Sequence, residues 1–532
     1  MNPTAAEQID ATDRDIDSLF TTQRPLGPIA VSGSERPARL RAFYDTRVNL
    51  HLQSEHSPPT FIVGRRGSGK TALLLSREFD PSNMTVRLSA QGAFSKVQSA
   101  ADLLSTRMVL TVEGVAELWD LLLWAPIVVR VATSPRHEVD PQLELQILWE
   151  ETAEARRLIA GDDSYDDTVL SFITGRLIDH IRDSENLIGI DSLRRDFRLA
   201  HRPWGEVIRA ALEVLRRRGT PVFVLVDSLE NVGSHVARIE ETLQGLFHHV
   251  GNLGLKTSPV NYRVQCCFPS ELWPLLDRIS ANPVKDFAGR MVLQWRWQDL
   301  LEAVGMRLRI FLKHRYPKLL RGVGPSDYRE HLDRVLPPSF ITPEGIAEQT
   351  VGYILRHTQL LPRQVLYIFN EALHRAIAAT KLPVVRDTDV VSAVAEVEAT
   401  LCPEVFSAYG FRYPRAHDVA RRLIPYLPFS FDDGYLHRSC NRAAIKADFG
   451  LDYREVREMF TDLGIIGRYL GETERYLRAE FSYSVDGHLI LSPDENYCLH
   501  PLFVRQYNAK GSLNRSFGGK PVYPSGMPES LL

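Results

Sequence analysis

The 532-residue chain lacks the features that mark secreted and membrane proteins. The N-terminal residues hold no basic region followed by an apolar run, and no window comes near about 18 uninterrupted apolar residues. Cysteines are few, odd in number and without C-x-x-C spacing, which argues against a disulfide framework. We therefore expect a cytoplasmic protein with reduced thiols at Cys266, Cys267, Cys402, Cys440 and Cys498.

A strong excess of charge is also missing. Lys and Arg together number 63, and Asp and Glu number 66, which gives a net charge of −3. This balance gives no sign of a polyanionic partner for the whole chain, although it leaves a local basic face open. The length predicts about two to four domains. The polar residues 1–25 and the Gly-, Ser- and Pro-rich residues 508–532 are typical of disordered, flexible ends.

Short apolar runs separated by helical patterns are present, and they predict an α/β fold with a parallel sheet buried on both faces. The interval between the second and third runs is too long for a compact crossover and reads as a helical insertion at about 100–210. It is interrupted by the acidic loop "GDDSYDD". We place the whole α/β core at 26–310, with strands at 60–63, 84–89, 222–227, 262–268 and 290–295.

The rest of the chain turns helical. Residues 311–410 have apolar side chains at helical spacing and predict an all-α unit. Residues 411–507 begin with helical patterns and end with two alternating stretches on either side of "VDGH". Because Asp-Gly is a hairpin signal, we expect a β-hairpin there. Helices followed by a hairpin suggest a winged-helix-like domain.

The stretch "GRRGSGKT" is the strongest functional signal in the chain. Gly64, Gly67, Gly69, Lys70 and Thr71 match G-x-x-x-x-G-K-[ST] in full, between an apolar strand and a helical pattern. Glycines let the backbone curl so that successive N–H groups face a β-phosphate. The lysine then reaches the β- and γ-phosphates, and the threonine hydroxyl binds Mg²⁺. The stretch therefore predicts a nucleoside triphosphate site.

Three further residues belong to the same loop: Arg65, Arg66 and Ser68. We count them among the nucleotide-binding residues because the loop backbone surrounds the phosphates. The motif does not explain the two adjacent arginines. Two directions stay open for their side chains, namely solvent and a neighbouring subunit after assembly.

Acidic and polar residues follow the central strands. Asp227 follows "VFVLV" and is expected beside the phosphate loop as a magnesium contact. Glu230 is a candidate general base that polarises the attacking water, and its alternatives are a helix cap or a surface ion pair. Ser270, after the fourth strand, is a candidate for facing the γ-phosphate, with an ordinary turn as the alternative.

One arginine is a candidate for closing the site. Arg363 follows Pro362 at a predicted helix start, where an arginine can lie over the γ-phosphate and couple a lid to the nucleotide. A solvated surface arginine is the alternative. Arg290 and Arg307 are further candidates, including as a finger for a neighbouring subunit, and the sequence does not choose between them.

With these parts in place, the chain resembles the P-loop ATPases with an extra central strand, the group that holds AAA+ and STAND proteins. It looks most like the bacterial STAND and origin-recognition-like branch. The resemblance is carried by "GRRGSGKT", "VFVLVDSLEN", "VLQWRWQDLLEAVGMRL", "TQLLPRQVLYIFNEAL" and the winged-helix-like end. It implies a strand order 5-1-4-3-2, a helical lid at 311–410 and a winged helix stacked on that lid.

The resemblance also implies ATP rather than GTP, since no N-K-x-D base-reading motif is present. One departure is informative. AAA+ motors carry adjacent Asp-Glu after the central strand, whereas Asp227 and Glu230 are three residues apart here. That spacing fits the switch-like branch better than a fast motor.

Charge is the test for DNA binding by the last domain. Residues 411–510 hold 14 Lys and Arg and 14 Asp and Glu, whereas a DNA-reading domain is usually strongly basic. A winged helix used for packing and oligomer contacts is therefore favoured, despite the local basic cluster at 412–422.

The leading hypothesis is an ATP-binding, slowly hydrolysing switch or assembly module that uses ATP and Mg²⁺, as in bacterial defence or signalling systems. Self-assembly or a protein partner is expected through the insertion or the winged helix. The alternative is a DNA-associated ATPase of the loader or initiator type. A third hypothesis is an inert nucleotide-bound scaffold.

Overall fold

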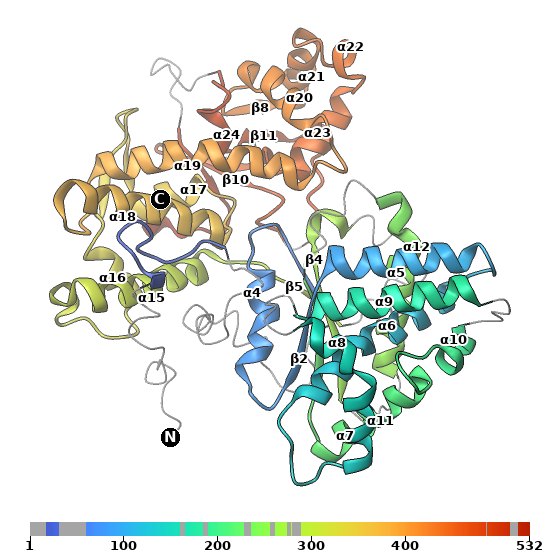
Figure 1. Ribbon diagram of the computed structural model, residues 1–532. Coiled ribbons are helices and arrows are strands. Elements are labelled where there is room, and N and C mark those ends of the chain that lie inside the picture. Colours follow the sequence, from blue (N-terminus) through green and yellow to red (C-terminus); the bar gives the residue numbers. More distant parts are fainter. Residues whose placement is uncertain are drawn as a thin grey trace.

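The computed structural model places the chain in two lobes (Figure 1). One lobe holds the sheet and the insertion, and the other holds the helical lid and the C-terminal domain. The residues that the structure describes are 18–30, 60–159, 165–184, 190–227, 236–255, 261–273, 278, 289–485, 487–510 and 520–532.

The central sheet has five parallel strands in the order β2-β3-β4-β1-β5. Read from the other edge, this is the predicted order 5-1-4-3-2, and the predicted α/β fold with a P-loop core is confirmed. The last strand is shorter than expected, because residues 293–295 turn over the loop that follows β1. The strands are β1 (Phe61–Gly64), β2 (Met84–Ser89), β3 (Val222–Asp227), β4 (Tyr262–Pro269) and β5 (Arg290–Val292).

The sheet separates two hydrophobic cores because successive side chains of a strand point to opposite faces. Ile62 and Leu225 belong to the core shared with the lid and the C-terminal domain. Phe61, Val63 and Val224 belong to the core shared with the insertion. Strands buried on both faces explain the continuous apolar runs in the sequence.

The helices within the predicted insertion, together with α5 and α12, cover one face of the sheet (Figure 1). The central one, α6, is buried along most of its length and crosses α12 closely: a Cβ at Gly245 would lie 2.4 Å from the Cγ1 of Val115. Their bounds are α5 (Ala90–Ser105), α6 (Val112–Thr133), α7 (Gln142–Glu151), α8 (Ala153–Leu158), α9 (Tyr165–Asp183), α10 (Ile190–Asp196), α11 (Trp204–Arg218) and α12 (Val236–Leu255).

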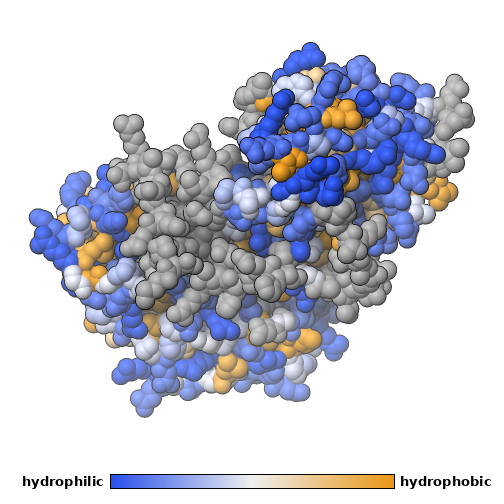
Figure 2. Space-filling view, turned by 90° about the horizontal axis from the view of Figure 1, so that it is seen from below, coloured by the Kyte–Doolittle hydropathy of each residue, from blue (hydrophilic) through white to orange (hydrophobic). Residues whose placement is uncertain are grey.

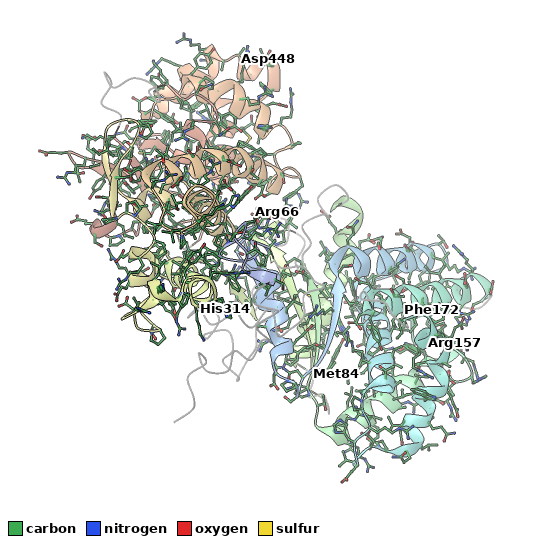
Figure 3. The ribbon with its side chains drawn as sticks, turned by 60° about the vertical axis from the view of Figure 1, so that its left-hand side comes forward. Arg66, Met84, Arg157, Phe172, His314 and Asp448 are labelled. Atoms are coloured by element: carbon green, nitrogen blue, oxygen red, sulfur yellow. The ribbon has the colours of Figure 1, made fainter. Side chains whose placement is uncertain are left out.

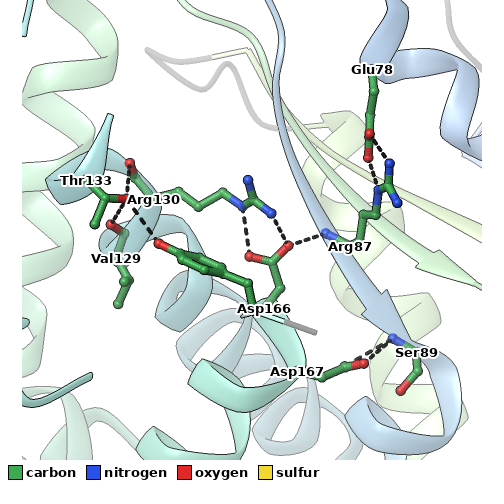
Figure 4. Close-up of polar contacts among 9 residues, drawn as sticks. Glu78, Arg87, Ser89, Val129, Arg130, Thr133, Asp166 and Asp167 are labelled. Atoms are coloured by element: carbon green, nitrogen blue, oxygen red, sulfur yellow. Dashed lines mark hydrogen bonds and ion pairs between the residues drawn. The ribbon is translucent and has the colours of Figure 1, made fainter. Parts of the chain in front are cut away.

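A polar network fixes the start of α9 against the end of β2 (Figure 4). Asp166 is buried and accepts hydrogen bonds from the Arg130 guanidinium at 2.6 and 2.8 Å and from the Arg87 N–H at 2.7 Å. Burial raises the pKa of Asp166, against the effect of Arg130. Asp167 accepts from the Ser89 N–H at 3.1 Å. The insertion therefore reaches the edge of the sheet at which β2 ends.

The lid is mainly helical, and a small antiparallel hairpin corrects the all-α expectation. It lies on the sheet face opposite the insertion, next to α4 (Lys70–Leu75) and the 3₁₀ turn Ser76–Phe79. Its elements are α15 (Trp297–Arg315), α16 (Tyr328–Asp333), β6 (Ser339–Ile341), β7 (Ala347–Gln349), α17 (Thr350–Arg356), α18 (Pro362–Thr380) and α19 (Asp387–Ala408).

The C-terminal domain has helices followed by a sheet in the order β12-β10-β9-β11-β8. The predicted hairpin at "VDGH" is wrong, because β10 pairs with β9 and not with β11. The turn instead lies at Thr473–Tyr476, where the Thr473 N–H donates to the Tyr476 carbonyl. The elements are α20 (Ala416–Leu423), β8 (Ser430–Asp432), α21 (Asp433–Arg442), α22 (Ile445–Phe449), α23 (Tyr453–Asp462), β9 (Ile466–Glu472), β10 (Leu477–Glu480), β11 (Asn496–Leu499), α24 (Pro501–Val504) and β12 (Val522–Pro524).

Both ends correct the expectation of disorder where the structure describes them. In the N-terminal segment, Phe20 is buried, and the Leu26 N–H donates to the Asn370 side chain of α18 at 2.6 Å. At the other end, β12 pairs with β10, and the buried Tyr523 donates its hydroxyl to Glu348 of the lid. Residues 1–17 and 511–519 lie outside the described residues.

Within the described ranges, no helix has the length and apolar character needed to cross a bilayer. All five cysteines are buried, and the described residues hold no disulfide. The face seen in Figure 2 is mainly hydrophilic, with apolar side chains in small groups.

A buried acid couples the stability of the lid to pH. Glu398 of α19 is fully buried and lies 2.5 Å from the Nδ1 of His357. Burial raises the pKa of Glu398 to about 8, against the charges of Arg505 and Arg356. Burial also lowers the pKa of His357 well below its usual range. Near neutral pH, burial therefore favours a protonated Glu398 beside a neutral His357 in the folded state.

We expect this pair to make stability fall as pH rises from about 6.5 to 8, since the folded state holds a proton that the unfolded chain has lost. The loss should come to about 1 kcal/mol across that window, because each group is only half-titrated at its limits. Below it, protonation of His357 in the unfolded chain offsets the Glu398 effect. Urea unfolding of the wild type and of Glu398→Gln at several pH values measures how the free energy of unfolding changes with pH. Its fall with rising pH should be absent in the variant. An equal pH slope in both proteins would contradict this.

Candidate phosphate-binding site

The loop between β1 and α4 has the backbone that phosphate binding requires. Gly67 and Gly69 have φ values of 85° and 90°, which side-chain-bearing residues rarely adopt. A Cβ at Gly64 would lie 2.5 Å from the Oγ of Ser68, so the curl of the loop also excludes a side chain there. Lys70 is buried, and its ammonium donates to the Arg65 carbonyl at 3.1 Å. Each predicted glycine thus has a steric reason.

The predicted magnesium contacts lie together. The Thr71 hydroxyl donates to the Oδ1 of Asp227 at 2.9 Å. Asp227 ends β3, and Thr71 is the second residue of α4, which follows β1; β4 lies between the two strands. A hydroxyl and a carboxylate at one edge of the sheet supply oxygen ligands of the kind that Mg²⁺ prefers. Glu230, the predicted general base, lies outside the described residues.

A buried polar atom supports the fit to a phosphate. Ser68 has no exposed surface, and its Oγ finds no hydrogen-bond partner within the described ranges. Buried hydroxyls are usually satisfied, so a hydroxyl without a partner inside a glycine-rich loop indicates an outside acceptor. With Lys70 and the Thr71–Asp227 pair, these residues fit a nucleoside triphosphate and Mg²⁺.

Arg363, the candidate for closing the site, lies against the loop. Its backbone N–H donates to the Gly67 carbonyl at 3.4 Å, at the start of α18. A Cβ at Gly67 would lie 3.2 Å from the Cβ and 3.6 Å from the Nε of Arg363. Gly67 therefore permits both the left-handed backbone and the close approach of the lid.

The other candidate arginines lie elsewhere. Arg307 donates to the carbonyls of Leu26 and Pro28, so it holds the N-terminal segment on the lid. Arg290 begins β5 next to Phe61, at the opposite end of the strands from the loop, and its guanidinium lies over the Trp273 ring. The structure does not bring either one to the phosphate loop.

The sequence patterns did not identify two residues that contact the loop. Glu271, directly after the candidate Ser270, is buried and accepts from the Arg66 N–H at 3.0 Å. The indole of Trp295 donates to the Ser68 carbonyl at 2.7 Å. Glu271 follows β4 at the same sheet edge as Asp227, so the position of strand ends could have identified it. Trp295 carried no such signal, because its contact depends on where the chain turns after β5.

The two loop arginines correct the expectation of solvent or a neighbouring subunit. Arg65 donates to the side chain of Gln359 in the lid at 2.7 Å. Arg66 donates to the Ser407 hydroxyl at the end of α19 at 2.8 Å. Figure 3 shows Arg66 between the two lobes. Both arginines therefore join parts of one chain, which local sequence does not reveal.

We expect Glu271→Ala to lower the free energy of unfolding by about 1.5–3 kcal/mol, because a charged acceptor of a loop N–H is lost. Glu271→Gln is the matched control, since its amide oxygen still accepts that bond, and it should cost less than about 1.5 kcal/mol. Urea unfolding followed by tryptophan fluorescence compares the two. Equal losses in both variants would show that the bond to the loop does not hold it.

Comparisons with known proteins find distant structural similarity alone. No protein-family model and no curated protein sequence matches the chain. A Walker-type ATPase of Pyrococcus abyssi is similar in structure, with 13% identity, a TM-score of 0.34 and coverage of 86% of this chain and 93% of its own. The ORC2 protein of Aeropyrum pernix, solved as ADPNP–ADP complexes, has 12% identity, a TM-score of 0.30 and coverage of 93% and 98%.

Proposed function

We propose that the chain is an ATP-binding, slowly hydrolysing switch whose lid and C-terminal domain respond to the nucleotide. The observation that carries this proposal is the position of the lid: Arg363 lies on Gly67 of the loop that leads to Thr71, whose hydroxyl bonds to Asp227. A site completed by a second domain is suited to report occupancy, since closure and binding are then linked.

The residues of the site have distinct roles in this proposal. The loop N–H groups and Lys70 hold the phosphates, and Thr71 and Asp227 hold the Mg²⁺. Magnesium, when bound, neutralises charge on the β- and γ-phosphates. Arg363 orients the lid over the loop, and Glu230 polarises water. The three-residue spacing of Asp227 and Glu230 favours slow turnover, and the lack of an N-K-x-D motif favours ATP.

The insertion is the proposed partner-binding surface. Of the twelve large apolar side chains that are exposed within the described ranges, six lie on it: Val109, Val112, Val139, Leu143, Trp149 and Leu158. Exposed apolar groups of this kind are common at protein interfaces. Self-assembly or a protein partner, of the kind found in bacterial defence or signalling systems, is consistent with this surface.

We expect Lys70→Ala to weaken ATP·Mg²⁺ binding at least about tenfold, because it removes a charge-assisted bond to the phosphates. Lys446→Ala, at an exposed position of α22, is the control and should bind as the wild type does. Titration calorimetry measures affinity, and light scattering with and without nucleotide measures assembly. A wild type that binds no ATP, or whose size and shape ignore it, would contradict the switch.

The charged side chains of the C-terminal domain do not favour the DNA-associated alternative. Arg412 of the basic cluster forms ion pairs with Glu458 and Asp462, and Arg457 of α23 pairs with Asp433. Charges already paired within the domain attract phosphates less.

We therefore expect no shift of duplex DNA in a gel at about 50 mM salt, with or without ATP·Mg²⁺. Purified chain at rising concentration, with a basic DNA-binding protein as the positive control, provides the test. A salt-sensitive shift that strengthens with ATP would favour the loader or initiator alternative.

A further inference from the structure

The side chain of Arg65 leaves the phosphate loop and ends between the lid and the C-terminal domain. Its Nη2 donates to the Oε1 of Gln359, in the turn between α17 and α18, at 2.7 Å. Its guanidinium carbon lies 5.5 Å from the centre of the Tyr483 ring in the C-terminal domain. A residue within the phosphate motif thus contacts both units outside the core.

Gln359 extends this contact in a fixed orientation. It is buried, and its Nε2 donates to the Leu463 carbonyl at 2.9 Å, directly after α23. Its backbone N–H donates to the Gln364 side chain at 2.6 Å. Because the amide nitrogen of Gln359 already donates to the Leu463 carbonyl, its amide oxygen must face Arg65. One glutamine therefore joins the loop to the C-terminal domain through the lid.

Tyr483 is fixed by a second buried chain of bonds. His500 has no exposed surface, and its Nδ1 accepts from the Leu502 N–H at 3.1 Å. Its Nε2 lies 2.7 Å from the Tyr483 hydroxyl and, in the neutral ring, donates to it. Burial lowers the pKa of His500 to about 3, so the ring is neutral. The face that Tyr483 offers to Arg65 is therefore rigid.

The link to phosphate binding is the backbone of Arg65 itself. Its carbonyl accepts the Lys70 ammonium at 3.1 Å. Lys70 is the residue expected to reach the β- and γ-phosphates. When that ammonium turns to a phosphate, the Arg65 carbonyl loses a donor at the point where its side chain holds the two other units. Arg66 adds a parallel contact, through Ser407.

We propose that Arg65 is a positioning residue that transmits the occupancy of the phosphate loop to the lid and the C-terminal domain. This inference rests on the proposed function and names the residue that performs the coupling. Arginine suits the task because its planar guanidinium donates to an amide at one edge while its face lies on an aromatic ring. Lysine offers a single point charge and cannot do both equally well.

Distances between spin labels test the coupling. Cysteines at Val109 of the insertion and Ile490 of the C-terminal domain are suitable, because these side chains are 89% and 72% exposed and all native cysteines are buried. We expect ATP·Mg²⁺ to shift the distance distribution in the otherwise wild-type chain. In Arg65→Ala the shift should be lost even at ATP·Mg²⁺ concentrations that saturate the variant.

The matched control is Arg209→Ala, an exposed arginine of α11 whose side chain bonds only to its own helix backbone at Gly205 among the described contacts. It should keep the nucleotide-dependent shift. Gln359→Leu removes the acceptor and keeps the volume, and it should reproduce the loss if Arg65→Ala folds poorly. Arg65→Ala and Gln359→Leu together should lose no more than either alone, because they break one link.

Two results would overturn the proposal. The first is a normal nucleotide-dependent shift in Arg65→Ala or Gln359→Leu. The second is a wild type that binds ATP without any shift, which would leave nucleotide binding intact and remove both the coupling and the proposed switch. If the wild type binds no ATP, the proposed function fails. The nucleotide-free samples then test the contact of Arg65 by themselves: Arg65→Ala must broaden the distance distribution, and an unchanged distribution would refute the contact.

Discussion

The carboxyl ends of β1, β4 and β3 meet at one edge of the sheet, and the rest of the molecule depends on this constraint. Parallel strands in this order bring Gly64, Glu271 and Asp227 together although more than 160 residues separate the first from the last. The lid and the C-terminal domain share a core with one face of the same sheet. The loop therefore lies where the core, the lid and the C-terminal domain meet, and a change in the loop acts on each of them through direct contacts.

The insertion occupies the other face and has a different part in the molecule. Among the described residues its hydrophobic core is separate from that of the lid, but Asp167 at the start of α9 reaches the end of β2, whose last residue pairs with Asp227. One face of the sheet thus packs against the lid and the C-terminal domain, and the other supports a large helical surface with exposed apolar side chains. This division suits a protein that receives a signal on one side and reports on the other.

Sequence patterns could predict the features that depend on residues close together in the chain. Buried strands need continuous apolar runs, and the tight loop needs Gly67 and Gly69, so the sheet, its strand order and the positions of Lys70, Thr71 and Asp227 followed from the sequence with the resemblance. The hairpin at Thr473–Tyr476 did not follow from the sequence. The apolar pattern of α23 continues into β9, so no change of pattern marks where the strand begins. The directions of Arg65 and Arg66 depend on residues about 300 positions away.

The central claim is that phosphate-site occupancy changes contacts in all three units at once. Hydrogen–deuterium exchange of the full chain with and without ATP·Mg²⁺ tests it most directly. We predict altered protection in the phosphate loop at 64–71 together with changes at 359–364 in the lid and at 463–483 in the C-terminal domain. Protection confined to the phosphate loop would contradict the account.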